Sequence, residues 1–151
     1  MDVPALAAAS TEVVRGRVLR AAAAWTGDHR RIVTRVRLAV LETWKGTAGQ
    51  ELTIVQPGGE VDGIGQRVEG IASLGPGEEV VLFLERSGPH HRIVGLAQGV
   101  YRVSADAASG SLHATPAGLE GLHLVSPPGR TPATRTAVSL AELRKAVQAA
   151  R

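Results

Sequence analysis

Residues 31–40 alternate between two kinds of side chain, and this pattern constrains the fold more than any other feature of the chain. One set of alternate positions holds three arginines, and the other set is apolar or β-branched: Ile32, Thr34, Val36, Leu38 and Val40. A period of two predicts a long β-strand with one face in the core and one solvated face. We therefore expect Arg31, Arg35 and Arg37 on one exposed face of a sheet.

Further strand signals surround this run. Residues 13–19, 52–55, 92–96 and 99–103 are rich in β-branched residues, and residues 80–84 are apolar on both faces, which predicts a central buried strand. At the C-terminal end, Ser139 and Glu142 form a capping box ahead of Leu140, Leu143 and Val147 at helical spacing. The pattern predicts a mainly β fold, an antiparallel barrel or curved sheet with a C-terminal α-helix packed against it.

The chain is long enough for one domain, which we assign to residues 1–151. The strand signals place the barrel core at about residues 10–104, preceded by a short helical turn over residues 6–9. Residues 105–138 carry weaker signals, with a hairpin expected around Ser109 and Gly110 and an extended linker at 126–129. The predicted helix covers residues 139–150.

Composition narrows the function classes. The chain has no cysteine, so disulfides and thiolate chemistry are excluded, and it has no apolar run of membrane-spanning length. The net charge is only +3, and no aromatic residue is interleaved with the arginines of residues 30–37, which argues against nucleic-acid binding. The histidines lack zinc-ligand spacing, and no phosphate-loop or nucleophile-elbow motif occurs. We predict no cofactor, no bound metal and no enzymatic activity.

Residues 57–69 form a glycine-rich segment that is unsuited to a helix and too long for a tight turn. We interpret it as an ordered functional loop or an irregular hairpin. In this interpretation Val61, Ile64 and Val68 anchor the segment, and the candidate contacts that project from it are Gly58, Gly59, Glu60, Asp62 and Gln66. The alternative is that the segment only closes the barrel. A calcium site is a weaker alternative, because two carboxylates are too few for the usual coordination number.

Trp25 and Trp44 bracket the long strand and complete the candidate binding set. Exposed tryptophan is frequent among the residues that dominate interface energetics. The alternative is core packing, because the aromatic content of the chain is only 3%.

Two segments carry a family resemblance: Pro57–Gly63, which reads Pro-Gly-Gly-Glu-Val-Asp-Gly, and Gly95–Gly99, which reads Gly-Leu-Ala-Gln-Gly. With the strand pattern around them, they make about residues 8–104 resemble a family of exported β-domains of myxobacteria and related high-GC bacteria. The chain is also remotely similar to netrin-like and tissue-metalloproteinase-inhibitor domains, which implies an OB-type barrel. Those inhibitors chelate zinc through an N-terminal cysteine, which this chain lacks.

These observations lead to one expected function and two alternatives. We expect a non-catalytic protein-binding or assembly module of an exported bacterial protein, located outside the cell, in the periplasm or on the cell surface, with its leader peptide absent from the chain. Its partner is expected to be another protein, such as a secreted protease or a surface assembly. The first alternative is an inhibitor or accessory domain of a secreted protease, and the second is a small hydrolase centred on residues 57–69.

Overall fold

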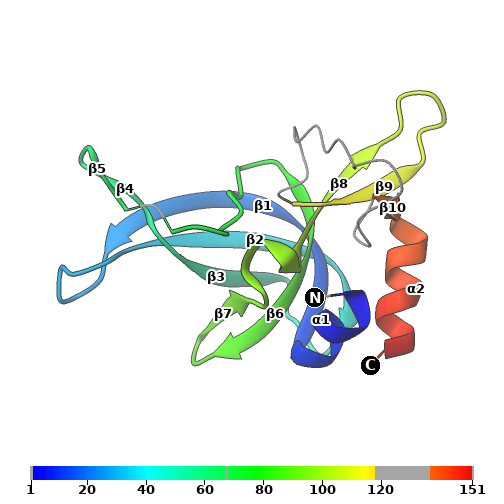
Figure 1. The fold of residues 1–151 in the computed structure, drawn as a ribbon, viewed down its shortest axis with the longest axis horizontal. Coiled ribbons are helices and arrows are strands. Elements are labelled where there is room, and N and C mark those ends of the chain that lie inside the picture. The colour runs from blue at the N-terminus through cyan, green and yellow to red at the C-terminus, as the bar shows by residue number, and fades with distance from the viewer. Residues whose placement is uncertain (1, 67, 118–136, 151) are drawn as a thin grey trace, which may run out of the picture.

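A computed structural model describes residues 2–66, 68–117 and 137–150 (Figure 1). The elements in chain order are α1 (Val3–Ala9), β1 (Glu12–Trp25), β2 (Ile32–Lys45), β3 (Glu51–Pro57), β4 (Gly59–Val61), β5 (Ile64–Gln66), β6 (Glu79–Ser87), β7 (His90–Ile93), the 3-10 helix η1 (Leu96–Gly99), β8 (Val100–Ala105), β9 (Leu112–Pro116), β10 (Val138–Ser139) and α2 (Leu140–Ala150). The predicted mainly β fold with a C-terminal helix is confirmed.

Five strands close a ring in the order β1-β2-β3-β7-β6, and β6 pairs back onto β1. The sheet is mixed, because β3 and β7 run parallel and meet at Ile54 and His91. The expectation of a wholly antiparallel sheet was therefore wrong at this seam. The reason is geometric: strands cannot alternate in direction all the way around a ring with an odd number of members, so one neighbouring pair must be parallel.

Strand β6 lies between two hydrophobic cores, which explains why its sequence is apolar on both faces. Val80, Leu82 and Leu84 point into the ring, where they join the core made by β1, β2 and β3. Val81 and Phe83 point the other way, into a second core shared with the helices. All residues from Val80 to Leu84 are fully buried, as predicted for a central strand.

The second core lies under α2. Leu140, Leu143 and Val147 are buried there, and α1 and α2 pack against each other. The Ser139 hydroxyl accepts the amide of Glu142 at 3.1 Å, so the predicted cap and the predicted apolar face of the helix are confirmed.

Several boundaries differ from the sequence expectation. Strand β1 continues through the alanines to Trp25, because β2 pairs with it along its length despite the helical propensity of alanine. Strand β7 stops at Ile93, since Gly95 and Leu96 both adopt positive φ and start η1. The hairpin expected around Ser109 and Gly110 joins β8 to β9. The predicted linker at 126–129 lies outside the described residues.

Candidate binding surface

Strands β4 and β5 form a hairpin, here called the arm, that projects from one end of the barrel (Figure 1). Val61 pairs with Ile64 across a two-residue turn, in which Asp62 has φ 51° and Gly63 has φ 80°. Two successive positive φ values are the geometry of a type I′ turn, and Asp-Gly is among its preferred sequences. The segment is therefore a hairpin, as one of the two interpretations held, but the exclusion of a tight turn was wrong, because two short strands occupy the residues on either side of Asp62 and Gly63.

The base of the arm crosses closely over β1 and β2. A Cβ at Gly59 would lie 2.7 Å from the Thr34 hydroxyl oxygen and 2.9 Å from the Ala23 methyl, and one at Gly58 would lie 2.8 Å from the Gln66 carbonyl. Both glycines have positive φ, and the Thr34 hydroxyl donates to the Gly58 carbonyl at 2.9 Å. These two candidate residues therefore allow the arm to cross the barrel.

Gln66 fixes the arm to the start of β2. Its amide oxygen accepts the backbone N–H of Ile32 at 2.7 Å, and its amide nitrogen donates to the Arg30 carbonyl at 3.4 Å. The expectation that Gln66 projects outward was wrong, because its side chain meets backbone groups that the β1–β2 turn leaves unpaired.

The outer part of the arm carries charge and one apolar side chain. Glu60 and Asp62 are exposed, as expected, and Ile64, which pairs with Val61 next to the turn, is 54% exposed. Val68, just beyond the arm, is 41% exposed. Of the three residues expected to anchor the segment, only Val61 is half-buried. The expectation was wrong for Ile64 in β5 and for Val68, which follows that strand, because both are exposed.

The two tryptophans have different environments. Trp44 is 1% exposed and packs in the core beneath α2, so it is no surface contact. Trp25 is half-buried at the end of β1, with its ring edge-on to His29 at a centroid distance of 5.7 Å. Of the aromatic pair considered from the sequence, Trp25 alone lies at the arm end.

Two grooves meet at the base of the arm and share Pro57, Gly58, Gln66 and Val68. The smaller groove, of about 350 Å³, opens between Thr34 and residues 71–74. The larger, of about 500 Å³, runs along the outer faces of β2 and β3 and is completed by Arg31, Ile32, Val33, Val55 and Arg92. Neither groove is lined by Glu60 or Asp62, so these carboxylates stand beside the grooves rather than inside them.

The arginines around the larger groove differ in their ion pairs. Arg31 and Arg35 are exposed, and neither forms a salt bridge within residues 2–66, 68–117 and 137–150. Arg37 pairs with Glu51, and Arg92 pairs with Glu85 at 2.9 Å. The predicted basic face of the long strand is confirmed for Arg35; Arg31 is exposed but precedes β2, and Arg37 is half-buried.

The turn next to this groove contains one relevant carboxylate. The pKa of Asp28 lies below its ordinary value because the Thr26 hydroxyl and the Arg30 backbone N–H both donate to it, and the charge of Arg31 adds to this effect. Asp28 is therefore ionised at neutral pH and lies in a tight turn of its own.

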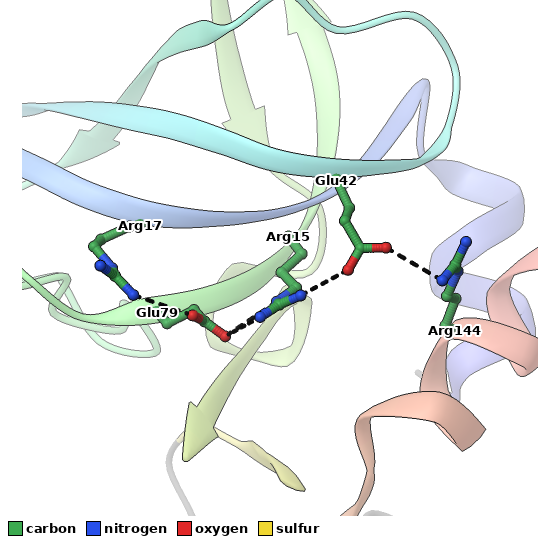
Figure 2. A network of polar contacts seen from close by, with 5 residues as sticks. All are labelled: Arg15, Arg17, Glu42, Glu79 and Arg144. Atoms are coloured by element: carbon green, nitrogen blue, oxygen red, sulfur yellow. Dashed lines mark hydrogen bonds and ion pairs between the residues drawn. The ribbon is translucent and has the colours of Figure 1, made fainter. Parts of the chain in front are cut away.

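The opposite end of the molecule is held by a chain of ion pairs (Figure 2). Arg15 bridges Glu42 at 2.7 Å and Glu79 at 3.0 Å, and Arg144 of α2 reaches Glu42 at 3.3 Å. The pKa of Glu42 is lowered, first by the hydrogen bond from Arg15 and further by the charge of Arg144. Each of these charges has a partner, which indicates a role in docking α2.

A separate polar cluster surrounds a buried carboxylate at the start of β1. Glu12 is fully buried and contacts both Arg86 of β6 and His91 of β7. Sequence reasoning missed this cluster because its members are far apart along the chain. It also missed Val55, Pro57 and Arg92 as groove residues, although the alternation of 51–57 would have placed Val55 and Pro57 on the same outer face.

The chain matches no protein-family model and no curated protein. In the part of the chain that the structure describes, no group of three or more potential metal ligands comes together. No helix there is long and apolar enough to cross a membrane.

Proposed function

We propose that this chain is a non-catalytic protein-binding or assembly module of an exported bacterial protein, and that the arm end is its recognition surface. The observation that carries the proposal is the combination of exposed Ile64 with Glu60 and Asp62 on an arm whose base is fixed. An apolar side chain surrounded by polar ones is typical of the contact surfaces of protein complexes.

The fixed base of the arm supports this proposal. Gln66 and Thr34 bond the arm to β2, and the glycines let it lie directly against β1 and β2. A loop that is already held in one conformation loses little conformational freedom on binding, so more of its contact energy appears as affinity. A flexible tether would not need these contacts.

The first alternative function, inhibitor or accessory domain of a secreted protease, follows from a proposed OB-type, netrin-like architecture. The ring order β1-β2-β3-β7-β6 with α1 and α2 packed beside it is compatible with a five-stranded Greek-key barrel. The exported location rests on the resemblance of residues 57–63 and 95–99.

The second alternative, a hydrolase centred on residues 57–69, has less support. A catalytic pair of carboxylates needs a shared pocket and opposed environments. Glu60 and Asp62 are both exposed on the arm, and neither lines the grooves at its base. The arrangement therefore favours contact over catalysis.

The test removes the charges of the arm without straining it. Asp62 has positive φ, so the variant Asp62→Asn is preferable to alanine, because asparagine tolerates that conformation. We combine it with Glu60→Gln in the immobilised full chain and measure capture of proteins from the secreted fraction of the source organism. The matched control is Glu142→Gln on α2, which keeps a residue suited to the capping box.

The proposal predicts that the arm variant loses at least about tenfold in partner affinity while Glu142→Gln captures the same partner as the native chain. The arm variant should remain folded, since exposed substitutions cost within about 0.5 kcal/mol. A folded arm variant with undiminished capture would contradict the proposal.

A further inference from the structure

We propose that the larger groove binds an extended, acidic segment of a partner protein, in which acidic side chains alternate with small apolar ones. This inference rests on the proposed protein-binding function and adds a second contact region to it. The region is distinct from the arm tip, because it lies along the outer faces of β2 and β3 and is bounded by β7.

The floor of the groove is set by strand register. Val33 lies opposite Pro57, and Arg35 lies opposite Val55, on the faces of β2 and β3 that point away from the ring. Val33 and Val55 are half-buried, and Val68 rises beside them. The result is a short apolar strip whose side chains are spaced as in a sheet, which suits a ligand in extended conformation.

One rim of the groove is cationic. Arg31 stands at the β2 end and Arg35 is the next outward residue along β2 beyond Val33, whereas Arg92 at the β7 edge is paired with Glu85 at 2.9 Å. Among the described residues, Arg31 and Arg35 have no carboxylate in salt-bridge range, whereas the neighbouring Arg37 is neutralised by Glu51. Arg35, together with Arg31, which interacts with the Asp28 carboxylate at longer range than a salt bridge, therefore places positive charge beside the apolar strip, and an acidic ligand complements it.

The same features favour a peptide over a nucleic acid. Single-stranded nucleic acids are held by aromatic stacking platforms together with a basic track. Among the residues that the structure describes, no aromatic side chain lines this groove, and Trp25 at the same end is half-buried against His29. Valine and proline side chains offer an apolar surface that fits aliphatic side chains better than the edges of bases.

The experiment uses the full chain and a short fluorescent peptide of alternating glutamate and valine, with an alternating lysine and valine peptide as comparison. Binding is followed by fluorescence anisotropy at low and at physiological salt. We expect saturable binding of the acidic peptide that weakens as salt screens the arginines, and no binding of the basic peptide. A single-stranded oligonucleotide of similar charge is titrated in parallel.

Variants locate the binding site. Arg35→Glu should weaken peptide binding at least about fivefold, and Arg31→Glu combined with it at least about tenfold, because both charges face the ligand. The control Lys145→Glu makes the same charge change on exposed α2, at the far end of the molecule, and should leave binding unchanged. Val55→Thr keeps the shape of the strip while making it polar, and should weaken binding with no change in salt dependence.

Each outcome decides the proposal. Equal binding of both peptides, tighter binding of the oligonucleotide, or equal losses in Arg35→Glu and Lys145→Glu would overturn it. Concentration-dependent self-association of the free chain, abolished by Arg31→Glu with Arg35→Glu, would assign the groove to a second copy instead. If the arm variant loses its partner while the groove variants keep it and the peptide fails to bind, this inference fails and the proposed function stands.

Discussion

The arm end and the helix end of this molecule are built from the same kinds of residue but use them in opposite ways (Figure 1). At the helix end, Leu143 and Val147 are buried, and Arg15 and Arg144 are paired with carboxylates. At the arm end, Ile64 and Val68 are exposed, and Arg31 has no ion pair among the described residues.

This difference in burial and ion pairing indicates that the helix end, and not the arm end, maintains the fold. Apolar burial contributes most of the favourable free energy of folding, and it is concentrated in the ring and under the helices. The arm consists of two three-residue strands that pair with each other. A two-stranded hairpin is marginal by itself, so the arm depends on its bonded base. Substitutions at the helix end should therefore affect stability, and substitutions at the arm end should affect binding.

The largest expected loss of stability comes from a substitution in the core beneath α2. Leu143→Ala removes a side chain that is 1% exposed and should lower the free energy of unfolding by about 2–5 kcal/mol. The comparison is Ile64→Ala on the arm, which should change it by less than about 0.5 kcal/mol. Urea denaturation monitored by circular dichroism measures both free energies, and similar losses in the two variants would contradict the division into a stabilising helix end and a binding arm end.

The next effect concerns the base of the arm. Gly59→Ala forces a Cβ to within 2.7 Å of the Thr34 hydroxyl oxygen at a positive φ, and should cost about 1–3 kcal/mol. Gly65→Ala meets nothing within 4 Å and should be close to neutral. Thermal melts of the two variants provide the measurement. A neutral Gly59→Ala would mean that the arm is free to move away from β1 and β2.

The ion-pair chain should have a smaller effect. Arg15→Met keeps the side-chain bulk but leaves Glu42 and Glu79 without their shared partner, which should cost about 1–3 kcal/mol. Arg17→Met, at a side chain that is 56% exposed, should cost less than about 0.5 kcal/mol. Chemical denaturation at moderate salt measures the free energy of unfolding of both variants. Equal losses in Arg15→Met and Arg17→Met would show that the ion pairs of Arg15 contribute no more to stability than an exposed pair.

The smallest effect is the pH dependence of the same network. The folded pKa of Glu42 lies below its ordinary value of 4.5, so its contribution to stability is fully present above that value. It is lost as pH falls through the lowered folded pKa, because protonation then removes the bonds from Arg15 and Arg144. Glu42→Gln should therefore show a shallower loss of unfolding free energy below pH 4.5 than the native chain, and an identical slope would contradict this assignment.

Much of the helix end could be predicted from sequence, because its signals are local. The capping box at Ser139 and the spacing of Leu140, Leu143 and Val147 depend only on helix geometry. The two apolar faces of residues 80–84 likewise required a buried strand. The parallel seam at Ile54 and His91 could not be predicted locally, since it follows from the number of strands in the ring.

The candidate site was predicted less well, because side-chain direction depends on distant partners. The Asp62-Gly63 pair is a local signal for a two-residue hairpin turn that the sequence analysis did not use, whereas the inward position of Gln66 depends on the N–H of Ile32, which is 34 residues away. The burial of Trp44 depends on α2, which folds over it from the other end of the chain. The groove combines β2, β3 and β7, and no single segment of sequence contains its pattern.

Hydrogen exchange of the full chain, measured alone and in complex with the captured partner, tests the division between the two ends most directly. If the arm end is the binding surface, the complex shows added protection of backbone amides at residues 58–66 and along the groove at residues 31–35, with exchange in α2 unchanged. Added protection confined to Leu140–Ala150, with residues 58–66 exchanging as in the free chain, would contradict it.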